Sequence, residues 1–545
     1  MRFLPVTSNA LLVELPDLDQ TLALLASLQR DPLPGVAELV PAARTILVHF
    51  RPWATSAAVL VRAIAVRDLS QRVERSDVLV EIPVRYDGED LAEVAQLLGI
   101  TPEEVVRRHT GREYTVAFTG FAPGFAYLSG GHPSFDVPRR STPRTRIPAG
   151  AVGLAGTFSG VYPQASPGGW QIIGVTPVPM WDLDRDQPAL LQPGYRVRFV
   201  DIATLNGGAH PPGSIAATPV RQPVQSLQSL QSLQSLQSDS APAAAALKVK
   251  GTGLQTLFQD LGRHGQARQG VSASGAMDQA ALKAANRLVG NRSDAAALET
   301  IGAGLQLQSV GESVLAVTGA DAPLTVCTAD GRQWDVPNHQ AVALADGDTL
   351  SVGQPLAGAR CYVAARGGFA VTPVLGSCAA DTLAKVGPAP LAVGDVINLR
   401  QAPAGAIVGA PETPAENLPT VEQEVVLDVV LGPRTDWFTA ESVQRLAAQR
   451  WQVTPQSNRV GLRLAGEVAL ERAIAGELPS EGTALGALQV PPSGQPVLFL
   501  ADHPLTGGYP VIGSVAPYHL DRAGQIPVGA WLRFHPVGAF EELQP

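Results

Sequence analysis

The chain has 545 residues, of which 45% are hydrophobic and 16% are charged, and its formal net charge is -9. This composition supports several buried cores and excludes a disordered chain. The acidic balance, without a basic patch, excludes nucleic acid as an expected partner.

The cellular setting follows from the cysteines and the apolar runs. The three cysteines form no C-x-x-C pair, so we expect neither a disulfide scaffold nor a zinc-thiolate site. The sequence contains no run of about 18 apolar residues, so it predicts no membrane span. The first residues lack the apolar stretch of a signal peptide. We therefore expect a cytoplasmic protein that does not interact with a membrane.

Residues 1–78 alternate between strand and helix patterns. The segment "DLDQTLALLASLQR" begins with Asp17 and Gln20 at capping-box spacing and continues with helical apolar periodicity. A second helical pattern, "TSAAVLVRAIAVRDL", follows two strands, and "VLVEIPVRY" predicts another strand. The order β-α-β-β-α-β predicts a small N-terminal split-βαβ domain.

Residues 79–205 are dominated by strand and turn patterns. One helix interrupts them in "ITPEEVVRRH", where Thr101 is the expected N-cap and Pro102 the first helical residue. The segment "QSLQSLQSLQSLQS" then fits neither a helical nor a strand core face, so it predicts a flexible Gln/Ser/Leu linker over 206–246. Two further units are predicted at 247–405 and 406–545.

One short pattern occurs three times. Two glycines and an aromatic residue, "GGW", "GGF" and "GGY", begin at residues 168, 367 and 507, and each copy is followed by a glycine just before a strand, at 194, 394 and 529. A glycine pair permits positive φ and close backbone approach, and the aromatic anchors the next strand. The repetition predicts three similar β-modules.

Most well-known catalytic signatures are missing. The sequence contains no G-x-x-x-x-G-K-[ST] and no G-x-S-x-G, so neither a P-loop nor a hydrolase nucleophile is predicted. None of the four lysines is followed by the serines of an amidase site or lies beside a methionine as biotin attachment requires. Metal-ligand spacings are weak, and we expect no metal site within the chain.

Two polar segments are candidates for binding anions. In "VPRRSTPRTRIPAG", prolines stiffen a run of four arginines that includes Arg139 and Arg144, and guanidinium groups suit carboxylate or phosphate. In "TPQSNRVGLRLAG", Asn458 and Arg459 precede a strand and suit an oxyanion. A solvated rigid loop and an ordinary turn are the respective alternatives.

A third polar segment is the helix predicted between Met277 and Val289 in "SGAMDQAALKAANRLVGN". One helical face carries four polar side chains, with solvent exposure as the alternative explanation: Gln279, Lys283, Asn286 and Arg287.

Long segments of the chain resemble two bacterial families. "GFAPGFAYL", "VPRRSTPRTRIPAGAVGLAG" and "GVYPQASPGGWQIIGVTP" resemble the B-type 5-oxoprolinase subunits, formerly allophanate hydrolase subunit 1, whose family includes Kip-type kinase inhibitors. "TLFQDLGRHGQARQGVSASGAMDQAALKAANRLVGN" and "SNRVGLRLAG" resemble the C-type 5-oxoprolinase subunits, formerly allophanate hydrolase subunit 2. The chain resembles the two subunit types fused.

The resemblance implies a mainly β fold with α+β parts: three cyclophilin-like β-barrels, at 79–205, 247–405 and 406–545, behind the small N-terminal domain. It also implies ATP-dependent opening of the lactam 5-oxo-L-proline to L-glutamate, with a separate A-type 5-oxoprolinase subunit as partner and with Mg²⁺ expected beside ATP. We expect the two halves to pack on each other, and self-association of the chain stays open.

Site residues follow from these segments and the chemistry. Arg139 and Arg144 are expected to bind phosphate or the substrate carboxylate, and Asn458 and Arg459 to stabilise an oxyanion. Further expected binding residues are Gly168, Gly169, Trp170, Thr506, Gly507, Gly508 and Tyr509. Expected supporting residues are Gln164, Asp278, Asn286 and Asp502.

Two other functions remain open. The same modules form the carboxyltransferase part of urea carboxylase, which implies carboxyl transfer from a carboxybiotin on another chain. A Kip-type regulator of a histidine kinase is the non-enzyme alternative. After "GGF", the sequence "GSCAA" at 376–380 replaces the family's usual Gly-Ser-Arg-Ser-Thr, so we expect the middle module to keep its structure and lose part of a site.

Overall fold

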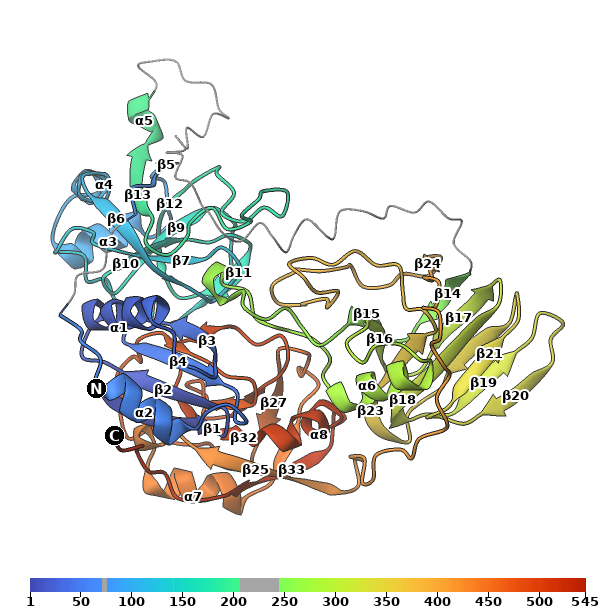
Figure 1. Cartoon of the computed structure of the whole chain (residues 1–545). Helices are drawn as coiled ribbons and strands as arrows, with labels where there is room; N and C mark the ends of the chain where they lie inside the picture. Colours follow the sequence, from blue (N-terminus) through green and yellow to red (C-terminus); the bar gives the residue numbers. More distant parts are fainter. Residues whose placement is uncertain (71–75, 141, 206–244) are drawn as a thin grey trace.

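The structure is a computed structural model that describes residues 1–70, 76–140, 142–205 and 245–545 (Figure 1). The fold is mainly β with a few helices, as predicted. In these described ranges, every helix is too short or too polar to cross a membrane.

The N-terminal sheet has four antiparallel strands in the order β1-β2-β4-β3. Asp17 caps α1 by accepting a hydrogen bond from the Gln20 backbone amide at 2.8 Å, which confirms the predicted helix start. The strand at 79–84 pairs with Arg196–Asp201 of the next unit, so the expected order β-α-β-β-α-β is wrong for this sheet, and the strand lies within the range predicted for the first barrel. The elements are β1 (Arg2–Thr7), β2 (Ala10–Glu14), α1 (Leu18–Arg30), β3 (Val36–Pro41), β4 (Thr45–Phe50) and α2 (Ala57–Ala65).

The first barrel is a seven-stranded sheet in the order β12-β9-β10-β7-β6-β13-β5. A bridge between Arg85 and Val175 joins its two edges. Thr101 caps α4 as predicted. The elements are β5 (Leu79–Val84), α3 (Leu91–Leu98), α4 (Pro102–Thr110), β6 (Glu113–Thr119), β7 (Ala126–Ser129), β8 (Arg144–Ile147), β9 (Ala151–Ala155), β10 (Phe158–Val161), β11 (Ser166–Gly168), β12 (Gln171–Val175), β13 (Arg196–Asp201) and α5 (Ile202–Leu205).

The middle unit has two sheets, with the orders β20-β19-β22-β17-β14-β24 and β15-β16-β23-β18-β21. Both enclose one apolar core, and we call them the middle sheets. Residues 206–244 of the predicted linker lie outside the described residues. The elements are β14 (Ala246–Thr252), β15 (Gln255–Gln259), α6 (Gln279–Leu288), β16 (Ala297–Ile301), β17 (Leu305–Val310), β18 (Ser313–Asp321), β19 (Leu324–Cys327), β20 (Gln333–Val336), β21 (Ala341–Leu344), β22 (Thr349–Val352), β23 (Ala357–Ala365) and β24 (Val396–Asn398).

The last barrel closes completely, in the order β25-β32-β29-β30-β27-β26-β33. Its core contains the fully buried Trp451. The elements are β25 (Glu424–Leu431), α7 (Ala440–Ala448), β26 (Trp451–Val453), β27 (Gly461–Ala465), β28 (Glu481–Gly482), β29 (Ala487–Gln489), β30 (Val497–Phe499), β31 (Thr506–Gly507), β32 (Val511–Val515), α8 (Leu520–Gly524) and β33 (Trp531–Pro536), with β28 and β31 forming a separate pair.

The last barrel contacts each of the other three units. An apolar cluster joins it to the N-terminal sheet through Leu505 and Ala484. The Tyr127 hydroxyl of the first barrel lies 3.3 Å from the Ser480 hydroxyl. Arg459 pairs with Glu299 of the middle sheets. The two halves of the chain therefore pack on each other, as predicted.

Candidate functional site at the junction of the units

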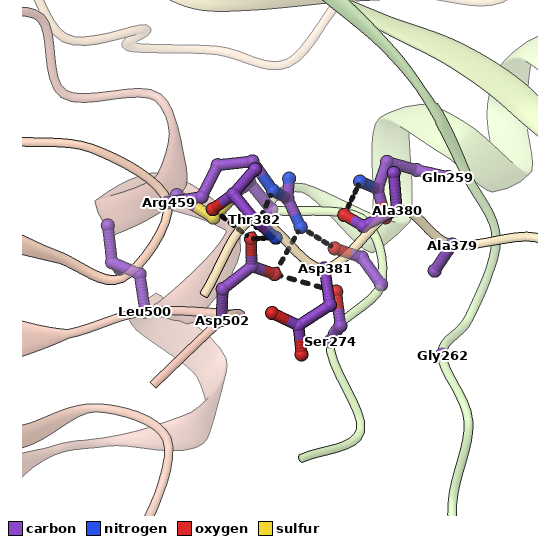
Figure 2. A network of polar contacts seen from close by, with 12 residues as sticks. Gln259, Gly262, Ser274, Ala379, Ala380, Asp381, Thr382, Arg459, Leu500 and Asp502 are labelled. Atoms are coloured by element: carbon purple, nitrogen blue, oxygen red, sulfur yellow. Dashed lines mark hydrogen bonds and ion pairs between the residues drawn. The ribbon is translucent and has the colours of Figure 1, made fainter. Parts of the chain in front are cut away.

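Asp502 is the centre of a buried polar cluster between the middle sheets and the last barrel (Figure 2). Its carboxylate accepts hydrogen bonds from Arg459 Nε and Nη2, both at 3.0 Å. It also accepts hydrogen bonds from the Ser274 hydroxyl at 2.6 Å and from the amide and hydroxyl of Thr382 at 2.8 and 2.7 Å. This carboxylate therefore joins segments that are more than 200 residues apart.

Arg459 completes this cluster. Its Nη2 donates to the Gly275 carbonyl at 2.6 Å, and its Nη1 donates to the Glu299 carboxylate. Burial disfavours the charged form of Arg459, but the negative charges of Asp502 and Glu299 outweigh the effect of burial and raise the pKa of Arg459. Burial also opposes ionisation of Asp502, and Arg459 with the hydrogen bonds lowers the pKa of that carboxyl. Both groups are therefore charged, and Arg459 is engaged on several sides.

A second acidic group lies beside this cluster. Asp381 accepts hydrogen bonds from the Ser272 hydroxyl at 3.0 Å and from the amides of Leu383 and Ala384. Burial, with the nearby charge of Asp502, raises the pKa of Asp381 to about 7. A carboxyl with such a pKa exchanges its proton near neutral pH.

Arg263 is a buried cation next to these acids. Its Nη2 donates to the Ala379 carbonyl, whereas its Nε and Nη1 have no hydrogen-bond partner within the described part of the chain. Burial lowers the pKa of Arg263, and Asp381 and Asp260 counteract this. The partly satisfied guanidinium faces residues 376–380, where the resemblance implies an altered site.

A cavity of about 180 Å³ opens beside Arg459. Its lining includes Glu299 and Arg360 from the middle sheets and Asn458 from the last barrel. Asn458 is exposed, and its side-chain oxygen accepts from the Val460 amide at 2.9 Å, as in a turn. The two residues predicted to hold an oxyanion thus border one cavity, Asn458 at its surface and Arg459 in its wall.

The first and last glycine–aromatic corners meet through the arginine-rich segment. A Cβ added to Gly508 would lie 2.6 Å from Arg139 Nη1. The Arg140 amide donates to the Gly169 carbonyl at 2.8 Å. Arg139 is half-buried and has no ion pair with any residue that the structure describes. Its guanidinium is therefore available beside Gly508.

The three glycine pairs differ in conformation. Gly367 and Gly368 adopt φ of 85° and 82°, whereas the pairs at 168–169 and 507–508 do not have positive φ. At Gly168 a Cβ would instead collide with the Tyr162 hydroxyl, and at Gly507 it would lie 2.5 Å from Gln489 Nε2. The outer copies therefore do not use the positive φ that a glycine pair permits, and at Gly168 the close approach of the buried Tyr162 leaves no room for a side chain.

Arg144 is held by a carboxylate of its own barrel. Its Nη1 and Nη2 donate to the two Asp90 oxygens at 2.8 and 2.7 Å. Burial opposes ionisation of Asp90, but Arg144 and the Ile172 amide lower the pKa of this carboxyl. An incoming phosphate would have to displace Asp90 from Arg144.

The remaining expected binding residues differ in exposure. Trp170 is buried and packs edge-on against Phe125, with ring centres 5.3 Å apart. Tyr509 is 37% exposed, and the Arg472 guanidinium lies 5.8 Å from its ring centre. Thr506 is buried, and its hydroxyl has no partner among the described residues. Only Tyr509 is placed to contact a ligand from solvent.

The four expected supporting residues lie at contacts between units or within α6. Gln164 donates to the Leu383 carbonyl at 3.2 Å. Asp278 caps α6, and burial raises its pKa to about 6. Asn286 is buried and donates to the Ala295 carbonyl. Asp502, in contrast, is the centre of the cluster.

Several residues of this site are not predicted from the sequence: Asp90, Arg263, Glu299, Arg360 and Asp381. Two of them had a signal. Glu299 and Arg360 are single charges within the apolar strands "ALETI" and "AGARCYVAA", and a charge at a buried strand position requires a partner.

Known proteins match both halves of the chain. Residues 1–191 match the family described as carboxyltransferase domain, subdomain C and D, and residues 269–536 match carboxyltransferase domain, subdomain A and B. The B-type 5-oxoprolinase subunit of Bacillus subtilis is 40% identical over 196 residues, which are 33% of this chain and 82% of that protein. The C-type 5-oxoprolinase subunit of Escherichia coli is 32% identical over 302 residues, which are 55% of this chain and 93% of that protein.

Two further similarities extend this picture. Urea amidolyase of Saccharomyces cerevisiae is 32% identical over 313 residues, or 54% of this chain but 17% of that protein. The crystal structure of TTHA0988 has a TM-score of 0.76 and 33% identity and covers 96% of this chain and 99% of its own. The chain therefore belongs to the carboxyltransferase-domain family of the B-type and C-type 5-oxoprolinase subunits, with both subunit types joined in one polypeptide.

Proposed function

We propose that this chain is a component of an ATP-dependent 5-oxoprolinase that opens 5-oxo-L-proline to L-glutamate together with a separate A-type 5-oxoprolinase subunit. One observation carries the proposal: consecutive parts of the chain match a B-type subunit over 82% and a C-type subunit over 93% of those relatives' lengths. Both subunit types are thus present at a fixed ratio of one to one.

The chemistry of lactam opening agrees with the residues at the junction. A lactam carbonyl is a poor electrophile, and phosphorylating its oxygen with ATP, which releases ADP, opens the carbon to attack by water. The ring C–N bond then breaks and leaves an acyl phosphate, whose hydrolysis releases phosphate and glutamate. Such a reaction depends mainly on positioning and on stabilisation of negative charge. Arginines and backbone amides suffice, without a serine nucleophile.

Arg139 is the expected catalytic arginine that the contacts favour most. Arg144 and Arg459 are each engaged by carboxylates, whereas Arg139 is unpaired among the described residues and lies beside Gly508 of the last glycine pair. In this proposal Arg139 holds the phosphate or the substrate carboxylate, with Tyr509 at the solvent side. ATP belongs to the proposal as the phosphoryl donor, and Mg²⁺ as the cation that accompanies it.

The test is glutamate formation by the full chain with its A-type partner protein, 5-oxo-L-proline, ATP and Mg²⁺. We expect glutamate and ADP in equal amounts and none without ATP. Arg139→Ala should lower kcat/KM at least about tenfold. Arg146→Ala, which changes an exposed arginine of the same segment, should leave it nearly unchanged. No glutamate with the cognate partner present would reject the proposal.

Carboxyl transfer is the second candidate, favoured by the 32% identity to urea amidolyase. In this case another chain would carry the biotin. Replacing the A-type partner protein with a biotin carboxylase and its biotinylated carrier distinguishes the two, because carboxylated urea would then form and glutamate would not. Altered autophosphorylation of a histidine kinase, without either reaction, would instead favour the Kip-type regulator.

A further inference from the structure

A second cavity, of about 390 Å³, lies between α6 and the last barrel. It is separate from the cavity beside Arg459, since the two share no lining residue. Volumes of this size are typical of sites for small molecules. The polar face of α6, which sequence analysis singled out, forms one of its walls.

Three side chains of this wall are spaced four residues apart on α6: Gln279, Lys283 and Arg287. Arg287 is neutralised by Glu412, to which it donates two hydrogen bonds, at 2.9 and 2.7 Å. Lys283 is half-buried and has neither an ion pair nor a hydrogen bond within the described ranges. Asn286, on the predicted polar face, instead points into the protein.

The acidic group of the cavity does not neutralise Lys283. Asp521 accepts hydrogen bonds from the backbone amides of Gln279 and Ala280, at 2.9 and 3.3 Å. Its charge thus faces the positive N-terminal end of α6, where Asp278 also accepts a hydrogen bond from an amide. Lys283 is left as the positive charge without a nearby partner among the described residues, in a wall that limits its contact with water.

The opposite wall is apolar. Leu485, Leu500, Pro517 and Leu520 of the last barrel line it, and Met277 lies at the start of α6. An apolar surface beside a single unpaired cation matches a small molecule with one negative group and an apolar body. A carboxylate suits the site, because both Lys283 Nζ and the Gln279 side-chain amide donate hydrogen bonds.

We propose that this cavity binds a small organic carboxylate, with the carboxylate on Lys283 and Gln279 and the apolar part against Leu500 and Leu520. The proposal deepens the proposed function and rests on it only for the choice of probe. The probe is 5-oxo-L-proline, the substrate of the proposed function, which carries one carboxylate on a compact ring. Lys283 would then bind the substrate carboxylate, so that of the two roles proposed for Arg139 only the binding of phosphate would remain.

The test is calorimetric titration of the full chain with 5-oxo-L-proline. We expect binding to one site, at least about tenfold weaker in Lys283→Met because a charge-assisted hydrogen bond is lost. Lys283→Arg should retain most of the affinity. Lys250→Met, which removes an exposed lysine of β14, is the matched control and should bind as the parent does. 5-Oxo-L-prolinamide, which keeps the ring and lacks the charge, should bind at least about tenfold more weakly than 5-oxo-L-proline.

Three results would overturn this inference: no binding of 5-oxo-L-proline at about 10 mM, equal affinity of Lys283→Met and the parent, or equal affinity for the amide. Thermal unfolding of each variant shows whether a lost affinity reflects a lost fold. The glutamate assay separates the two proposals. Glutamate formation with unchanged binding in Lys283→Met rejects the cavity alone, and Lys283-dependent binding without glutamate formation rejects the proposed function alone.

Discussion

Two arginines of the last barrel, Arg434 and Arg459, are 2% and 3% exposed, and each joins carboxylates of different units. Arg434 pairs with Glu481 of its own barrel and Glu14 of the N-terminal sheet. Arg459 pairs with Asp502 of its own barrel and Glu299 of the middle sheets. The last barrel is thus attached to the N-terminal sheet and to the middle sheets in the same way, by a buried arginine that pairs with carboxylates of both units.

The two clusters differ in their access to water. Glu14 also pairs at 2.9 Å with Arg2, whose side chain is 38% exposed. Glu299 and Asp502 are 4% and 0% exposed, so their charge depends on Arg459 and other buried groups. The Arg434 cluster therefore has a second cation, Arg2, at the surface. The carboxylates of the Arg459 cluster are instead buried from water, and the cluster borders the cavity beside Asn458.

The largest effect is expected from Arg459→Met. Removing the cation leaves the buried Asp502 without an ion pair and Glu299 with only the buried Arg360 at 3.7 Å, which costs about 3–5 kcal/mol of the free energy of unfolding. Urea denaturation measures it. Arg463→Met, at an exposed position of the adjacent strand, should change the free energy by less than about 0.5 kcal/mol. A loss below about 1 kcal/mol for Arg459→Met would show that the cluster is not closed to water.

Arg434→Met should cost less, about 2–3 kcal/mol, because Arg2 still neutralises Glu14. The double variant Arg2→Met/Arg434→Met should lose more than the sum of the two single losses, since each arginine compensates for the other. The same urea experiment tests this. Additive losses would remove the proposed difference between the two clusters.

The glycine corners extend the comparison from charge to packing. Gly168→Ala should destabilise the protein by about 2 kcal/mol, because Tyr162 is buried and cannot move aside. Gly508→Ala should cost less than about 1 kcal/mol, because the flexible, half-buried Arg139 can yield. Thermal unfolding of both variants checks the order, and a reversed order would contradict the assignment of rigid and yielding neighbours.

The last effect is measured as a slope: a pH dependence beside the Arg459 cluster. The pKa of Asp381 is about 7 in the folded protein and 3.8 ordinarily, so the folded state binds more protons between these values. The free energy of unfolding should therefore fall as pH rises from about 4 to about 7. Asp381→Asn should reduce this slope by up to about 1 kcal/mol per pH unit.

Urea denaturation at several pH values between these limits measures the slope. Asp436→Asn is the matched control, since Asp436 pairs with Arg2 near the Arg434 cluster and is 32% exposed. Its slope should equal that of the parent, in which Asp278 also contributes. An unchanged slope in Asp381→Asn would show that Asp381 is ionised throughout this range.

Local sequence determined the elements whose signals lie within a few residues. Asp17 and Thr101 begin their helices as expected because the cap and its amide are three residues apart. The glycines at 194, 394 and 529 each precede a strand as expected, because this is a short backbone feature; the similarity of the three β-modules stays a prediction. The strand at 79–84 was assigned to the wrong sheet, since its parallel partner β13 begins more than 100 residues later.

The sequence by itself determined which side chains carry charge. It also determined which strands alternate between polar and apolar residues and which strands are apolar throughout. Only the tertiary structure decided which charged side chains form ion pairs. Arg459 pairs with Glu299, 160 residues away in the sequence, and Arg144 pairs with Asp90, 54 residues away. It also left Arg139 and Lys283 unpaired within the described chain. The physical reason is that an ion pair depends on distance and burial, which sequence spacing does not specify once strands pair across units.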